Sequence, residues 1–344
     1  MKILVVKLSA FGDIIHALPA LDDLLARPEV SEVHWLVDKR YAFVGEIFPK
    51  QIKVHAIALK GSHPVKSSLS IIRQLRRIGF DVVLDLQGLI KSAVLAKAVK
   101  RRVFGIDSSH IREKPAAWLQ NNVCFHPDER HVVQQYRRVA AAPFTDNWQK
   151  KPEKPIPYKA PGIDLYSTSI PAMPQLLEEL GLTGQDYIVL HAAGGWETKL
   201  LPEKCWLAVA NGLNDRGIKP VFSWGNLDEK DMAKNLADRS NGYALPERLN
   251  MSELVALLTG ARAVVGADTG VLHLAAALGT PTVTFWGPSA SWRSAPFSDG
   301  AQGAIHWHIE SDPACGPCFK RTCSNFICMD AIQADAILGA IDDI

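Results

Sequence analysis

The chain has 344 residues, 47% of them hydrophobic and 22% charged, and its formal net charge is +2 at pH 7. This length and composition predict a globular protein with room for two domains of ordinary size. They exclude a membrane-spanning chain, because no window reaches the roughly 20 apolar residues of a span. The first residues show no signal-peptide pattern, so we expect a cytoplasmic protein.

Apolar strands alternate with amphipathic helical stretches through the first half of the chain. This rhythm is typical of a parallel α/β sheet covered on both faces. The strands are expected at 2–6, 33–37 and 81–85, and the helices at about 17–27, 67–78 and 90–99.

The first strand runs into a turn that contains Gly12 and Asp13. Open α/β sheets bind ligands beyond the carboxyl ends of their strands, so Asp13 is the strongest candidate for a catalytic residue. A dinucleotide fingerprint needs three glycines, and only Gly12 is present here. Asp38, which follows the second strand, could imitate the ribose-binding acid of a dehydrogenase, but a turn residue at a strand end is the simpler interpretation.

A proline-rich stretch at 143–161 is expected to link two domains, and the strand pattern then begins again. Two α/β domains joined in this way would face a central cleft, the common setting of a small-molecule site. The second set of strands is expected at 187–191, 219–223, 263–265 and 282–286. We place the domains at 1–155 and 156–330, with a terminal helix at 331–344 that could pack back on the N-terminal domain.

Three segments of the second half have the composition of a nucleotide site. The turn of Asp268, Thr269 and Gly270 precedes a short helix whose N-terminus could hold a pyrophosphate, although either of the first two could simply cap that helix. A flexible loop with Gly194 and Gly195 leads to Lys199, which could neutralise a leaving phosphate. A carboxylate after the 219–223 strand could accept hydrogen bonds from a ribose; Glu229 and Asp228 are the candidates.

Four cysteines gather near the end of the chain. They are Cys315, Cys318, Cys323 and Cys328. Their residue type suits a structural Zn or Fe site, and free thiols or disulfides are the alternatives.

The two halves differ in charge. Residues 1–150 carry 23 Lys and Arg against 14 Asp and Glu, and residues 151–344 carry 15 against 22. The basic half points to an anionic partner such as nucleic acid, a phosphorylated glycolipid or a membrane surface. A solvated basic face without a partner is the alternative.

Taken together, the motifs resemble those of glycosyltransferase family 9, the lipopolysaccharide heptosyltransferases, and within it the heptosyltransferase I type. The resemblance spans nearly the whole chain. It rests on KLSAFGDIIHALPAL at 7–21, DLQGLIKS at 85–92, GID at 105–107 with Arg112, HVVQQYR at 131–137 and DTGVLH at 268–273.

The resemblance implies an α/β fold of two Rossmann-like domains (GT-B) and an inverting transfer of L-glycero-D-manno-heptose from ADP-heptose to Kdo of lipid A. Asp13 would be the general base, which takes the proton of the acceptor hydroxyl. On the donor side, Lys199 would lie near the diphosphate, Glu229 at the ribose and Met251 beside the adenine. The other expected donor contacts are Asp268, Thr269, Gly270, His273, Gly194 and Gly195.

The anionic acceptor gives the basic half a function. Arg112 matches an acceptor-side arginine, and Ser9, Gly12, Lys60 and Lys66 are further candidates. No cofactor is required for catalysis, and no nucleic acid is expected as a partner. The lipid anchor of the acceptor implies peripheral contact with the cytoplasmic face of the inner membrane.

Other functions remain open at this stage. A later-acting heptosyltransferase, or a transferase of the same fold with another nucleotide sugar, would keep the same motifs. A non-catalytic protein that binds a nucleotide sugar or lipid A would keep the glycine loops but would not depend on Asp13.

Overall fold

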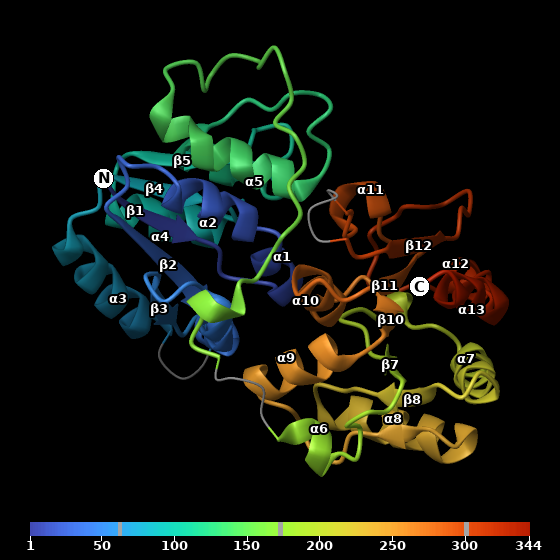
Figure 1. The fold of residues 1–344 in the computed structure, drawn as a ribbon. Coiled ribbons are helices and arrows are strands. Elements are labelled where there is room, and N and C mark those ends of the chain that lie inside the picture. Colours follow the sequence, from blue (N-terminus) through green and yellow to red (C-terminus); the bar gives the residue numbers. More distant parts are fainter. Residues whose placement is uncertain (61–63, 171–174, 299–302) are drawn as a thin grey trace. The chain divides into compact units, whose positions relative to one another are not determined.

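The computed structural model describes residues 1–60, 64–170, 175–298 and 303–344. The chain forms two compact units, Met1–Ser169 and Ile170–Ile344 (Figure 1). Each unit contains one six-stranded sheet in which all strands are parallel. The predicted α/β class with two parallel sheets is confirmed.

The sheet of the first unit has the strand order β3-β2-β1-β4-β5-β6. This is the Rossmann order. Successive strands are added outward from β1 on one side up to β3, and the chain then returns to place β4 on the other side of β1, so the strand order reverses between β1 and β4. The strands are β1 (Lys2–Val6), β2 (Glu32–Asp38), β3 (Lys53–Ile57), β4 (Val82–Asp85), β5 (Val103–Gly105) and β6 (Asn121–Asn122).

Helices cover both faces of this sheet. One face carries α3 and α4, and α2 packs against α5 on the other. The α-helices are α1 (Phe11–Ile15), α2 (Leu18–Leu25), α3 (Pro64–Ile78), α4 (Ile90–Val99) and α5 (Val132–Ala141). The 3-10 helices are η1 (Lys39–Ile47), η2 (Lys114–Leu119), η3 (Ala142–Phe144) and η4 (Leu165–Ser167).

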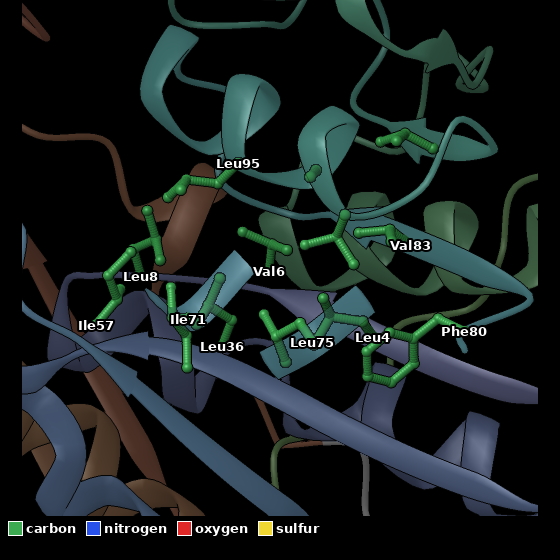
Figure 2. Packing of buried hydrophobic residues seen from close by; sticks show 13 residues of the cluster. Leu4, Val6, Leu8, Leu36, Ile57, Ile71, Leu75, Phe80, Val83 and Leu95 are labelled. Carbon is green, nitrogen blue, oxygen red and sulfur yellow. The ribbon is translucent and has the colours of Figure 1, made fainter. Parts of the chain in front are cut away.

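The side chains of β1 alternate between the two faces of the sheet, and the two faces have different surroundings. Leu4, Val6 and Leu8 point into the core under α3 and α4, where Figure 2 shows Leu4 beside Leu75 and Phe80. Successive side chains of a strand point to opposite faces, so Lys7 points toward α5 instead. A lysine thus lies under the sheet at the end of an apolar strand.

The second unit repeats the same topology. Its sheet has the order β12-β11-β10-β7-β8-β9, and since β7 is the first strand of this unit, the order is again that of a Rossmann fold with its reversal between β7 and β10. The strands are β7 (Tyr187–His191), β8 (Lys219–Phe222), β9 (Tyr243–Ala244), β10 (Ala263–Ala267), β11 (Thr282–Trp286) and β12 (His306–Glu310).

Two groups of helices pack in the second unit. Helix α7 contacts α8 and α13, and α9 contacts α6 and α10. The α-helices are α6 (Leu176–Glu179), α7 (Glu203–Asp215), α8 (Leu227–Ser240), α9 (Met251–Gly260), α10 (Gly270–Ala277), α11 (Ser291–Ser294), α12 (Ile327–Asp330) and α13 (Ala334–Asp342). A short 3-10 helix, η5, spans Glu197–Lys199.

The units divide between residues 169 and 170, later than the expected boundary at 155. The proline-rich stretch packs on the first unit instead of standing free. Gln134 donates a hydrogen bond to the carbonyl of Ile156 at 2.7 Å, and Lys159 pairs with Asp22 at 3.1 Å. The backbone at Lys50 is bonded to the carbonyl of Ser167.

The terminal helix α13 packs on α7 within the second unit. Leu338 fills the space above Gly212, where an added Cβ would lie 2.5 Å from its Cδ1. Arg216 and Asp342 then join the two helices by an ion pair at 2.7 Å. A glycine on α7 therefore allows the close approach of the last helix.

Candidate active site

Asp13 follows β1 at the point where the strand order reverses. It is the third residue of α1, and its Oδ2 accepts a hydrogen bond from the Ala10 backbone at 3.3 Å. About a third of the side chain, 35%, stays exposed, so the carboxylate is held by the turn and can still meet a ligand. Ser9 and Gly12 lie in the same turn, as expected.

A buried lysine lies behind this carboxylate. The Nζ of Lys7 is 3.9 Å from Asp13 Oδ2, and it donates to the Leu86 carbonyl at 3.0 Å and to the Tyr136 hydroxyl at 2.8 Å. Burial lowers the pKa of Lys7, but the charge of Asp13 and the contact with Tyr136 outweigh burial and raise it. Lys7 therefore stays protonated at neutral pH and provides the counter-charge of Asp13.

The loop after β4 closes the same end of the sheet. Gln87 Oε1 accepts hydrogen bonds from the backbone of Leu8 and Ser9, at 2.9 and 3.0 Å. Asp85 is fully buried, and burial raises its pKa to about 6 in spite of hydrogen bonds from Gln87 and Ser92. The DLQG motif thus fixes the turn that precedes Asp13.

The basic residues expected on the acceptor side differ in position. The backbone of Arg112 lies against the β4 loop, near Gly88, and its side chain is exposed. Lys60 and Lys66 are also exposed, but they follow β3, which is two strands away from β1 in the sheet. Arg112 is therefore the one of the three that the sheet brings next to the loops of β1 and β4.

In the second unit, Asp268 follows β10 and forms a buried triad with Lys199 and His273. Its Oδ2 is 2.6 Å from Lys199 Nζ, and its Oδ1 is 2.9 Å from His273 Nε2. Burial raises the pKa of Asp268, but the hydrogen bond from His273 and the charge of Lys199 outweigh it and hold the pKa far below its usual range. Asp268 is therefore ionised at every physiological pH.

The Asp268 turn leads directly into the N-terminus of α10. The N-cap residue of α10 is Thr269, and no side chain caps the helix. Within the described part of the chain, the buried Thr269 hydroxyl has no hydrogen-bond partner. Thr269 is thus the N-cap residue by position, but no side-chain hydrogen bond from Asp268 or Thr269 caps the first amides of α10, from Gly270 on.

The glycine loop and Lys199 belong to the same place. Lys199 Nζ also donates to the backbone carbonyl of Asp268 at 2.9 Å, which ties the loop after β7 to the loop after β10. Gly194 packs against Leu200, whereas nothing lies within 4 Å of where a side chain on Gly195 would begin. The two loops meet at the reversal point of the second sheet, where Rossmann folds bind nucleotides.

Glu229 and Met251 follow the neighbouring strands β8 and β9. Glu229 Oε2 accepts a hydrogen bond from the backbone of Gly225 at 2.7 Å, and Asn226 caps α8. Met251 begins α9 and is 5% exposed. Asp38, the dehydrogenase-like residue of the first unit, instead binds Arg40 and caps η1, as expected of a turn residue.

The four cysteines near the end of the chain were the candidates for a metal site. Within the four described stretches, no three His, Cys, Asp or Glu side chains are arranged to hold a metal ion. Cys323 Sγ is engaged in a local turn with the backbone of Asn325 at 3.3 Å. The predicted Zn or Fe site therefore has no support in the structure, and none of the six cysteines, all of which lie in the described ranges, forms a disulfide.

No helix in the described ranges has both the length and the apolar character to cross a membrane.

Solved structures define the class of the fold. The chain aligns over its full length with E. coli heptosyltransferase WaaC solved with ADP-2-deoxy-2-fluoro heptose, with a TM-score of 0.74 at 24% identity and 99% coverage of that chain. It aligns equally with E. coli ADP-heptose lps heptosyltransferase II, with a TM-score of 0.74 at 18% identity and 98% coverage. The fold is the GT-B fold of two-domain glycosyltransferases.

Sequence comparisons define the family. The model of glycosyltransferase family 9 (heptosyltransferase) matches residues 68–327. Lipopolysaccharide heptosyltransferase 1 of Pseudomonas aeruginosa is 30% identical over 94% of this chain and 88% of its own length. The protein of that name from Escherichia coli K12 is 29% identical over 84% of this chain and 88% of its own length. The chain belongs to glycosyltransferase family 9 and is a heptosyltransferase of the lipopolysaccharide core.

Proposed function

We propose that the chain transfers L-glycero-D-manno-heptose from ADP-heptose to Kdo of lipid A, with inversion at the anomeric carbon. Relatives named lipopolysaccharide heptosyltransferase 1 support this choice of reaction, and WaaC has been solved both with ADP and with an ADP-heptose analogue. The observation that carries the proposal is the Asp13 carboxylate, exposed at the reversal point of the first sheet beside a buried cation.

Asp13 acts as the general base. An alcohol is a weak nucleophile, and a carboxylate within hydrogen-bond reach removes its proton as the oxygen attacks the anomeric carbon. The new C–O bond forms while the bond to the β-phosphate oxygen breaks, and ADP leaves with that electron pair. Lys7 Nζ, 3.9 Å from Asp13 Oδ2, supplies a positive charge next to this carboxylate.

The second unit holds the donor. Its Lys199 and the amides at the start of α10 favour the diphosphate, because a helix N-terminus carries partial positive charge. Gly194, Gly195 and Gly270 let the backbone approach the phosphates, and Thr269 offers an unused hydroxyl. Glu229 accepts from the ribose hydroxyls, and Met251 lies at the adenine.

The first unit binds the acceptor. Its excess of Lys and Arg complements the carboxylate of Kdo and the phosphates of lipid A. Arg112, beside the β4 loop, contacts the Kdo group, and Lys60 and Lys66 meet more distant charges. Since lipid A is anchored in a bilayer, the enzyme works at the cytoplasmic face of the inner membrane.

The test is transfer from ADP-heptose to Kdo-lipid A, followed by mass spectrometry, with the wild type, Asp13→Asn and the control Asp128→Asn. Asp128 is an exposed aspartate of the same unit, 77% exposed and far from β1 in sequence. Loss of a general base lowers turnover by roughly 10²–10⁴-fold. We expect such a loss for Asp13→Asn, with ADP affinity within a few-fold of the wild type and the control unchanged.

The other outcomes separate the alternatives. A wild type that gains no heptose-sized mass on this acceptor, but does so on a longer core or with another nucleotide sugar, would identify a different transferase of the same fold. Unchanged turnover in Asp13→Asn would remove Asp13 from the mechanism. Binding of ADP-heptose without turnover on any core acceptor would indicate a non-catalytic binding protein.

A further inference from the structure

The cysteine-rich segment, residues 311–326, follows β12 and packs on the donor loop. Thr198, which is 2% exposed, donates a hydrogen bond from its hydroxyl to the Lys320 carbonyl at 2.7 Å. The backbone of Phe319 donates to the Pro288 carbonyl at 2.8 Å, and Ser311 is bonded to Trp286 at 2.9 Å. The segment is thus fixed both to the loop of Lys199 and to the end of β11.

Two cations meet on one aromatic ring at this contact. Lys199 Nζ lies 4.4 Å from the centre of the Trp196 ring, and the guanidinium carbon of Arg321 lies 5.5 Å from it. Both distances are within the range of cation–π attraction. Trp196 therefore holds Arg321, from the cysteine-rich segment, close to the lysine of the donor loop.

The two cations differ in how they are compensated. Lys199 is buried and its charge is neutralised by Asp268 at 2.6 Å. Arg321 is exposed, and the described residues offer it neither an ion pair nor a hydrogen bond. A diphosphate that binds beside the neutral Lys199–Asp268 pair needs further positive charge, and Arg321, on the same Trp196 ring, carries a charge that no carboxylate of the described residues compensates.

We propose that Arg321 is a second diphosphate-binding residue, which makes the cysteine-rich segment part of the donor site. The proposal rests on the placement of ADP-heptose in the second unit. The planar guanidinium group of an arginine can donate hydrogen bonds to two phosphate oxygens at once, and stacking on Trp196 orients this group before the ligand binds.

The test compares ligands that differ only in their phosphates. ADP, AMP and adenosine are titrated into the full-length protein by calorimetry, with the variants Arg321→Ala, Arg321→Lys and Lys199→Ala. Arg262→Ala is the matched control, because Arg262 is an exposed arginine of the same unit that pairs with Asp186 instead. Circular dichroism and the melting temperature verify that each variant is folded.

We expect Arg321→Ala to weaken ADP about ten-fold, AMP less and adenosine not at all, as for the loss of one charge-assisted hydrogen bond. Arg321→Lys keeps the charge but not the planar guanidinium group, so it should lose less affinity for ADP than Arg321→Ala does. The affinity of wild type for ADP falls with added salt, and Arg321→Ala reduces that slope. The Arg262→Ala control binds all three ligands as the wild type does.

Three results would overturn the proposal. If Arg321→Ala binds ADP like the wild type while Lys199→Ala loses affinity, the donor site stands and Arg321 is not part of it. If Arg321→Ala weakens ADP and adenosine equally, the residue acts on the fold of the loop and not on the phosphates. If neither variant affects ADP, the placement of the donor at these loops fails together with this inference.

Discussion

The substitution Asp268→Asn should destabilise the second unit strongly. The carboxylate is 2.6 Å from Lys199 Nζ, and the two side chains are only 14% and 9% exposed. At this distance, the Coulomb attraction is about 6 kcal/mol for an effective dielectric constant of about 20, before the cost of burying both charges. Removal of one partner leaves a buried, uncompensated lysine, which typically costs about 3–5 kcal/mol.

The assay is urea and thermal unfolding at pH 7. For a unit of this size, a loss of about 3 kcal/mol lowers the melting temperature by roughly 10 °C. Asp186→Asn is the control, since Asp186 forms an exposed ion pair with Arg262 at 3.1 Å and such pairs contribute about 0–1 kcal/mol. Because the pKa of Asp268 is depressed, its stabilisation is present above the unfolded pKa of about 3.9 and is lost as the pH falls through the folded value.

A double variant completes the argument. Lys199→Met together with Asp268→Asn leaves no unpaired charge in the site, so it should be more stable than Asp268→Asn alone. The reasoning is refuted if Asp268→Asn stays within about 1 kcal/mol of the wild type, or if the second substitution brings no recovery. Either result would mean that water reaches Lys199 and screens it.

Two further substitutions test the packing and titration of the two sheets. Burial raises the pKa of Asp85 to about 6. Its contribution to stability is therefore present below the unfolded pKa of about 3.9 and is lost as the pH rises through about 6. In Asp85→Asn, the urea midpoint should depend less on pH across this range. Gly266→Val should cost at least about 2 kcal/mol in urea unfolding, because a Cβ there would lie 2.7 Å from Leu272 and 3.0 Å from the His191 carbonyl. Gly195→Ala is the control, because nothing lies within 4 Å of a Cβ placed on Gly195, and it should leave stability unchanged. Equal melting temperatures of the two variants would contradict this steric explanation.

The central strands could be predicted from the sequence because they are buried on both faces. The apolar runs of β1, β7 and β11 stand out without any knowledge of their neighbours. Five strands were not predicted: β3, β5, β6, β9 and β12. Strands β5, β6 and β9 have only two or three residues, and the edge strands β3 and β12, KVHAI and HWHIE, are mostly exposed or half-exposed. An edge strand is defined by its pairing with the next strand, which local composition does not encode.

The candidate site could be predicted only in part. The turns of Asp13 and Asp268 were found because they follow buried strands. The role of Lys7 was missed, although a lysine at the end of an apolar strand is a visible signal, because its partners Leu86 and Tyr136 lie far along the chain. Contacts of this kind depend on the sheet order and cannot be read from spacing.

The hydrogen bond from Lys7 to Tyr136 also determines when the turn with Asp13 can reach its final structure during synthesis. Its hydroxyl partner, Tyr136, lies 129 positions further along the chain. At about 5–20 residues per second, the ribosome needs roughly 6 to 26 s to add them. The turn with Asp13 is thus among the first parts of the protein to be made and among the last of its unit to reach its final structure. For most of that time the nascent chain carries Lys7 and Asp13 without the Tyr136 hydroxyl that holds the lysine in place.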